Sequence, residues 1–490
     1  MNPPTLYKIC IREVSRYLTE GVWNKADENP VSRLPRSIAS DLMKHSFSQQ
    51  TLTFENSRLL LTCGLVISLD IKHTIRRDDN LMLFQMFTKD SGQTLRCLHL
   101  ECHTFNKTRD LETLFQGCSK LKDLHIQFPF DLNLLRNYKL RSLKLHCCKS
   151  FEQNYSLEQD TKFRTLASSM QTLENFSICI NNISLAMLGL NVLFSFFKYK
   201  TVASILMNCR RILSVGLVDS LLAINYIHTS LGYSPVYELR RCFWRILNYH
   251  DTNKAFLPSS YEQAILRAVL SCPYLKKLIF HVSYIEGIIP LRNLQNLTYL
   301  ILYFSHCEGD ILPTFQFLLK KIGHQLKYLA VIGIDNFPIN MVCRYCKNLE
   351  TLAIDGRNIS FESKETSPEL LCLTSLSIID VDRSVLFLLP KCPNLKWLSL
   401  HNAECLNDEL LQTVMEGDTL SQLKQLFILH CSISRSGLRL LLERTRSIDK
   451  IYVHSMRFEI SSVLETLGRQ NINIDGTVEN FPPYLDTCDF

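Results

Sequence analysis

Residues 392–400 read Cys-Pro-Asn-Leu-Lys-Trp-Leu-Ser-Leu, and the spacing of their apolar side chains recurs along most of the chain. Leu398 and Leu400 are separated by one residue, so in a strand both side chains point to the same face of a sheet. Leu395 lies just before that strand, and Cys392 is small and apolar enough to be buried at the end of a preceding helix. The stretch therefore predicts a short strand with one buried face.

Further copies of this pattern occur with and without the leading cysteine. Copies with cysteine begin at Cys118, Cys209, Cys272, Cys346 and Cys392, and others have their first anchor at 95, 140, 173, 297, 326, 373, 423 and 448. From residue 275 onward the anchors are spaced by 22 to 29 residues. This period and motif are typical of leucine-rich repeats, whose coils stack to bury a common core. We therefore predict an α/β leucine-rich repeat solenoid, a horseshoe of the cysteine-containing class.

Composition limits the class of protein. The 490 residues are 46% apolar and 21% charged, as in a globular chain. A net charge of +7 is mild for this length, so nucleic acid is not required as a partner. The apolar stretch 184–197 is shorter than the roughly twenty residues that a membrane span needs, and we expect a buried helix there. No signal peptide is evident, so we expect reduced thiols and a cytoplasmic or nuclear location.

We expect four segments along the chain. They are a helical segment over 1–45, a cap and linker over 46–94, the repeat solenoid over 95–475 and a tail over 476–490. Between 180 and 270 only one copy of the repeat is clear, so degenerate repeats and an insertion both remain open there. Within that stretch the spacing of Leu239, Cys242, Phe243 and Ile246 favours a helix.

Catalytic and metal-binding motifs are absent from the sequence. There is no Gly-rich phosphate loop, no Gly-x-Ser-x-Gly and no His-Glu-x-x-His. Cys343 and Cys346 form one close pair, but Cys346 already has a place in a repeat, so we predict packing and no metal. We therefore expect no cofactor and no catalytic residue in this chain.

The first candidate functional segment is residues 5–14, Thr-Leu-Tyr-Lys-Ile-Cys-Ile-Arg-Glu-Val. Leu6, Cys10 and Val14 are four residues apart, which places them on one face of a helix. Two interpretations make different predictions. A helix that only caps the repeats would bury Leu6 and Cys10, whereas a helix that docks a partner would leave them exposed.

The second candidate segment is residues 34–42, Leu-Pro-Arg-Ser-Ile-Ala-Ser-Asp-Leu. Leu34, Ile38 and Leu42 share one face of a predicted helix, and Pro35 suits its first turn. The pattern Leu-Pro-x-x-Ile-x-x-x-Leu therefore predicts a second amphipathic helix shortly after the first.

These two segments resemble known adaptor-binding boxes. The first is similar to the BC-box, which binds elongin C, and the second to the cullin-2 box. Two such boxes ahead of leucine-rich repeats resemble the Zyg-eleven and Zer-one substrate receptors of cullin-2 ubiquitin ligases. That family continues into an armadillo-like domain that is not evident here, so its substrate specificity is not carried over.

The resemblance implies partners and roles for residues. Elongin C would contact Leu6, Cys10 and Val14, and the cullin would contact Leu34, Pro35, Ile38 and Leu42. Elongin B and the RING partner of cullin-2 would complete the complex, and the repeats would hold a protein substrate for ubiquitination. The chain would be a non-catalytic subunit that acts by bringing the reactants together.

Alternatives remain open at this stage. Leu34 to Met43 also resembles the start of an F-box, which binds the Skp adaptor, although that interpretation gives residues 5–14 no role. A leucine-rich scaffold outside any ligase would need the repeats alone. RNA binding is disfavoured because Arg pairs such as Arg240-Arg241 are isolated. The cullin-2 box alone does not distinguish cullin-2 from cullin-5.

A substrate-binding surface is predicted on the sheet. Strand residues that flank the buried leucines should point away from the core, and Tyr and Trp at such positions are favoured binding anchors. The hypothesised contacts are Tyr299, Tyr303, Tyr328, Trp397, His401 and Phe427. The alternatives are that these aromatic rings pack on each other, or that residues 481–490 cover them.

Overall fold

The structure is a computed structural model of the 490-residue chain. It describes residues 6–23, 28–48, 54–72, 89, 92–101, 108–128, 130–147, 157–180, 199–245, 258–282, 284–304, 311–334, 337–355, 359–360, 368–381, 383, 388–415, 420–445, 447–454, 460–468 and 472–474. The chain divides into two compact units, Met1–Val218 (unit 1) and Asp219–Phe490 (unit 2). The expected helix over 184–197 and the tail lie outside the described residues.

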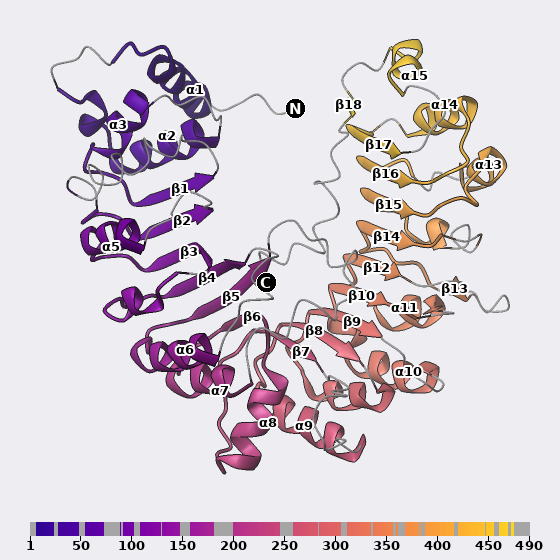
Figure 1. Ribbon diagram of the computed structural model, residues 1–490. Coiled ribbons are helices and arrows are strands. Elements are labelled where there is room, and N and C mark those ends of the chain that lie inside the picture. The colour runs from indigo at the N-terminus through magenta and orange to yellow at the C-terminus, as the bar shows by residue number, and fades with distance from the viewer. Residues whose placement is uncertain are drawn as a thin grey trace. The chain divides into compact units, whose positions relative to one another are not determined.

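Unit 1 begins with helices and continues as alternating parallel strands and helices (Figure 1). The leading helices are α1 (Leu6–Thr19), η1 (Pro30–Arg33), α2 (Arg36–Ser48) and α3 (Phe54–Leu61). The rest is β1 (Ser68–Lys72), β2 (Cys97–Glu101), α5 (Thr108–Gly117), β3 (Asp123–Phe128), η2 (Leu132–Leu135), β4 (Ser142–Cys147), α6 (Leu157–Ser169), β5 (Asn175–Ile180), α7 (Tyr199–Asn208) and β6 (Ser214–Asp219). The strands pair in chain order, and β1 starts the sheet within the expected linker over 46–94.

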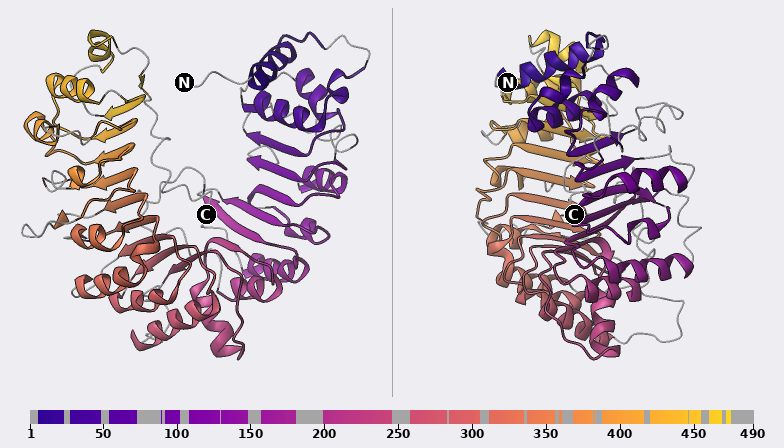
Figure 2. Two further views of the ribbon diagram at one scale, coloured as in Figure 1. Left: turned by 180° about the vertical axis from the view of Figure 1, so that it is seen from behind. Right: turned by 90° about the vertical axis from the view of Figure 1, so that its left-hand side faces the viewer.

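Unit 2 continues the alternation. Its elements are α8 (Leu221–Ser230), β7 (Arg241–Arg245), α9 (Pro258–Ser271), β8 (Lys277–Val282), η4 (Ile285–Asn293), β9 (Tyr299–Phe304), α10 (Ile311–Ile322), η5 (Gly323–Gln325), β10 (Tyr328–Ile332), β11 (Phe337–Pro338), α11 (Ile339–Tyr345), β12 (Thr351–Asp355), β13 (Ile359–Ser360), β14 (Ser375–Ile379), η6 (Leu389–Lys391), β15 (Trp397–His401), α13 (Asp408–Met415), β16 (Gln425–Leu429), α14 (Arg435–Arg444), β17 (Lys450–His454), α15 (Ile460–Thr466) and β18 (Asn473–Ile474). Except for the separate β11–β13 pair, its strands form one layer in chain order, with helices outside it (Figures 1 and 2).

The strand register explains the repeat. Leu398 lies opposite Leu376 and Leu426 of the neighbouring strands, and Leu400 lies opposite Ile378. All of these side chains are buried. Within each unit most coils are also tied to the one before, since two successive amides donate to one carbonyl ahead of the preceding strand, as Lys396 and Trp397 do to Thr374. These features confirm the predicted leucine-rich repeat fold.

The repeat cysteines are buried, as predicted. Cys118, Cys209, Cys272, Cys346 and Cys392 all belong to the core. Each accepts a hydrogen bond at its carbonyl from the amide three residues on, for example from Leu395 to Cys392 at 3.3 Å. Burial raises the pKa of Cys118 to about 12, which keeps it protonated and apolar. These thiols therefore fill the turn between a helix and the next strand.

The irregular stretch contains repeat strands, in place of the helix expected around residues 239–246. Arg241–Arg245 form β7, which pairs in parallel with β8. Cys242, Phe243 and Trp244 are consecutive and all buried, so apolar residues cover both faces of this strand. A strand of this kind loses the alternation by which strands are recognised in a sequence.

Gly216 interrupts the repeat in β6. Its φ of +57° is a conformation that residues with a side chain rarely adopt. A Cβ atom there would lie 2.5 Å from the Cβ of Ser177 in the neighbouring strand. Ser214 is the last residue of β6 in register with β5, so the copy that begins at Cys209 is distorted just after its first strand residue.

Candidate functional site

Helix α1 exposes the row of residues that the BC-box resemblance singled out. Leu6 is 77% exposed, Cys10 is exposed and Val14 is half-buried. The other side of the helix carries Ile11 and Leu18, which are buried. A helix that served only as a cap would have buried Leu6 and Cys10. The observed orientation is the one that docking requires, and binding to elongin C stays a prediction.

Helices α1 and α2 are joined by polar contacts as well as by apolar ones. The Tyr7 hydroxyl donates to Asp41 Oδ2 at 2.7 Å. The hydroxyls of Ser15 and Ser46 form a buried hydrogen bond of 2.9 Å. The Asp41 carboxylate raises the pKa of Tyr7 by accepting its hydrogen bond. The two candidate boxes therefore lie side by side, on two helices that are hydrogen-bonded to each other.

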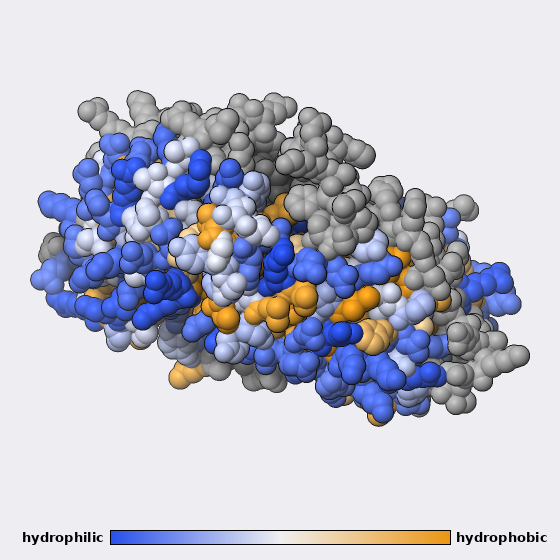
Figure 3. Space-filling view, turned by 90° about the horizontal axis from the view of Figure 1, so that it is seen from below, coloured by the Kyte–Doolittle hydropathy of each residue, from blue (hydrophilic) through white to orange (hydrophobic). Residues whose placement is uncertain are grey.

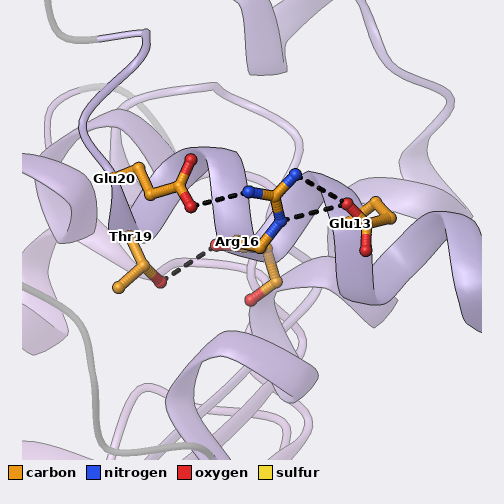
Figure 4. Close-up of polar contacts among 5 residues, drawn as sticks. Glu13, Arg16, Thr19 and Glu20 are labelled. Carbon is orange, nitrogen blue, oxygen red and sulfur yellow. Dashed lines mark hydrogen bonds and ion pairs between the residues drawn. The ribbon is translucent and has the colours of Figure 1, made fainter.

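A third side of α1 is charged. Arg16 donates to Glu13 from Nε at 3.1 Å and from Nη2 at 2.9 Å, and to Glu20 from Nη1 at 2.7 Å (Figure 4). The hydroxyl of Thr19 donates to the carbonyl of Ser15 at 3.0 Å. Exposed pairs of this kind contribute little to stability. They form an exposed charged side of α1 that its apolar row does not share.

The predicted cullin contacts divide into surface and core residues. Pro35 is exposed, and Leu34 and Ile38 are half-buried. Leu42 is completely buried. Its expected contact with a cullin is therefore corrected: Leu42 belongs to the core of unit 1, on the helix that contacts α1 and β1.

The aromatic residues of unit 2 form two groups on the sheet. Tyr299 and Tyr328 are in register and stack with ring centroids 3.8 Å apart and planes 16° apart. Trp397 lies on β15, three strand steps from β10. Its ring centroid is 5.6 Å from that of Phe427, which is 6.5 Å from that of Tyr452. Small residues on β12 and β14, such as Ala353 and Ser377, separate the groups. Lateral ring contacts therefore account for part of the aromatic pattern.

Two hypothesised substrate contacts are buried and so differ from the expectation. Tyr303 is 3% exposed and Phe427 is 6% exposed, so neither offers a ring to a ligand in this structure. His401 is half-buried and contacts the Ser399 hydroxyl through Nε2 at 2.8 Å. Burial, with a smaller contribution from His430, lowers the pKa of His401 to about 4. The half-buried Tyr299, Tyr328 and Trp397 remain as surface candidates, and all three are first residues of their strands.

An exposed apolar group on α9 and in the turns that follow α8 and α9 was not predicted. It consists of Leu231, Tyr233, Val236, Leu270 and Tyr274. Tyr237 donates its amide to the Ser271 carbonyl at 2.8 Å, which brings the two segments together. Figure 3 views the molecule from the side where α8 and α9 lie and shows apolar residues within a mostly hydrophilic surface. Ala268, Val269 and Leu270 are three apolar residues in a row, and only Leu270 is exposed. The sequence of such a run does not reveal which of its residues faces solvent, so the exposed group could not be predicted.

Among the described residues, no group of His, Cys, Asp and Glu side chains is arranged to hold a metal ion. Cys343 and Cys346 are both buried in the core. In the same part of the chain, no helix has both the length and the apolar character needed to cross a bilayer.

Comparison with known proteins adds distant likenesses only. No family model matches the chain, and no curated protein matches its sequence. The chain is similar to Rad7 in the yeast Rad7 and Elc1 complex, with 15% identity over 98% of this chain and 99% of that chain and a TM-score of 0.44. It is also similar to an internalin of Listeria monocytogenes (14% identity, 77% and 90% covered, TM-score 0.36) and an LRR protein of Leptospira interrogans (13% identity, 85% and 91% covered, TM-score 0.29). No functional argument follows from similarities this low.

Proposed function

We propose that this chain is a substrate-recognition subunit of a cullin-2 ubiquitin ligase that contains elongins B and C. Helix α1 docks elongin C through Leu6, Cys10 and Val14. The start of α2 contacts the cullin through Leu34, Pro35 and Ile38. The sheet of unit 2 holds the protein substrate, and the chain itself contributes no catalytic group. It acts in the cytoplasm or nucleus.

The observation that carries this proposal is the orientation of α1. An apolar row is directed to solvent while Ile11 and Leu18 hold the helix against its own unit. Burying one leucine stabilises a complex by about 1.5–3 kcal/mol. Association itself costs several kcal/mol, so one leucine does not suffice. The exposed Pro35, just before the adjacent helix α2, and the half-buried Ile38 on it supply a second contact.

The decisive experiment is a pull-down with purified elongin B/C and cullin-2. The full-length chain should retain both partners. Leu6→Ala combined with Cys10→Ala should weaken elongin C binding by about tenfold or more, since about 1.4 kcal/mol corresponds to a factor of ten. Pro35→Ala combined with Ile38→Ala should reduce cullin-2 while leaving elongin C.

Ile9→Ala is the matched control. Ile9 is 43% exposed on α1 but lies off the Leu6, Cys10 and Val14 row, so its loss should leave elongin C bound. Equal losses from Ile9→Ala and from the double variant would show that the row has no special role. Retention of the Skp adaptor in place of elongin C would identify an F-box protein. Failure to retain any of these partners would leave a leucine-rich scaffold.

A further inference from the structure

In unit 2 the chain enters each strand of the main sheet from β7 to β17, which excludes β11 and β13, through a pair of residues at the same edge of the sheet, here called the leading edge. The pairs are Arg240-Arg241, Lys276-Lys277, Thr298-Tyr299, Lys327-Tyr328, Glu350-Thr351, Thr374-Ser375, Lys396-Trp397, Lys424-Gln425 and Asp449-Lys450. From β8 onward, the two backbone amides of a pair donate to the carbonyl of the first residue in the pair of the preceding strand. Lys276 and Lys277, for example, donate to the Arg240 carbonyl at 2.8 and 2.9 Å. The pairs are therefore stacked in register.

The leading edge is strongly basic. Eight of its residues are Lys or Arg, and two, Glu350 and Asp449, are acidic. Lys327 pairs with Glu350 at 2.7 Å, which neutralises the centre. Arg240 and Lys276 near one end and Lys396 and Lys424 near the other are exposed, and no acidic side chain in the described part of the chain forms an ion pair with these four. The edge thus carries two positive groups, and the Lys327–Glu350 pair between them has no net charge.

Aromatic and hydroxyl side chains form the surface between the two positive groups. Tyr299 stacks on Tyr328, and the Lys277 ammonium lies 5.1 Å from the centroid of the Tyr299 ring. Thr351 and Ser375 follow, both half-buried, and then Trp397. Such a surface suits the side chains and backbone of an extended peptide.

We propose that the leading edge binds an acidic linear segment of a protein, which under the function proposed above is the substrate. Carboxylates at the two ends of the segment meet Arg240 and Lys276 at one end and Lys396 and Lys424 at the other. Strands β8 and β15 are five strand steps apart, or about 24 Å at about 4.8 Å a step. An extended chain crosses that distance in about seven residues, so the acidic groups should be separated by that spacing.

A peptide fits this edge better than a single-stranded nucleic acid. Single strands bind by stacking bases on open aromatic faces. The facing sides of Tyr299 and Tyr328 cover each other, and Lys277 lies over the Tyr299 ring. Positive charge is also concentrated at the two ends of the leading edge, whereas a nucleic acid carries a phosphate at every nucleotide.

The test measures fluorescence anisotropy of a labelled peptide with two glutamates at each end and a seven-residue uncharged spacer. The full-length chain should bind this peptide, and binding should weaken as salt is added. A peptide of the same composition with its four glutamates together should bind several-fold more weakly. Arg240→Glu combined with Lys276→Glu, and separately Lys396→Glu combined with Lys424→Glu, should each raise the Kd about tenfold.

The matched control is Lys320→Glu combined with Lys321→Glu, which reverses the same number of charges on exposed positions of α10. It should leave the Kd unchanged. Equal losses in the control, no binding by the wild-type chain, or tighter binding of an oligouridylate would each overturn the proposal. Elongin B/C binding is measured on the same samples. Elongin binding without peptide binding would overturn this site alone, and peptide binding without elongin would overturn the ligase role alone.

Discussion

Helix α1 and strand β15 use the same residue types in opposite ways. Leu6 is 77% exposed and Cys10 is exposed, whereas Leu398 is 1% exposed and Cys392 is fully buried. Both motifs place apolar residues in a row on one face. The row of β15 is flanked by further coils on both sides, while nothing in the described chain covers Leu6 and Cys10 of the row on α1. Neighbouring elements, and not the motif, therefore decide whether the row forms core or surface.

The largest expected effect is the contrast between the two leucines. Leu398→Ala should lower the free energy of unfolding by about 2–5 kcal/mol, because it removes buried methyl groups and leaves a cavity. Leu6→Ala should change it by less than about 0.5 kcal/mol. Urea denaturation of both variants measures the difference. Similar losses would mean that α1 is a cap, and the docking proposal would then fail.

A smaller effect is the pH dependence of stability that His401 on β15 contributes. The pKa of His401 is lowered to about 4 from its ordinary 6.5, so its contribution is complete above pH 6.5 and is lost as the pH falls towards 4. Between pH 7 and pH 5 the wild type should lose up to about 2 kcal/mol more than His401→Gln. Denaturation curves at both pH values test this. Identical pH dependence would show that His401 is solvated like an ordinary histidine.

The smallest effect distinguishes the two cysteines. Cys392→Ser should cost about 1 kcal/mol, because a hydroxyl replaces a thiol in the core. The loss is limited since the new hydroxyl can donate to the Leu388 carbonyl, 3.4 Å from Cys392 Sγ. Cys10→Ser should leave stability unchanged within measurement error. Thermal unfolding of the two variants supplies the comparison, and a greater loss at Cys10 would contradict the exposure described here.

The strands could be predicted wherever burial alternates. Leu98 and Leu100, and equally Leu398 and Leu400, are two apart and share one face, which is a local property of an extended chain. Strand β7 escaped prediction because Cys242, Phe243 and Trp244 are buried on both faces. Leu42 and Tyr303 were expected at binding surfaces, but their burial depends on elements distant in the sequence.

The sequence alone determined the repeat period and with it the parallel strands, because the same apolar pattern recurs every 22 to 29 residues. It also determined the row of Leu6, Cys10 and Val14, which follows from spacing within a few residues. The tertiary structure decided which rows are covered, since burial depends on what lies alongside. It also assembled the leading edge. Arg240 and Lys276 read as isolated positions in the sequence, and stacking of successive coils brings them next to each other.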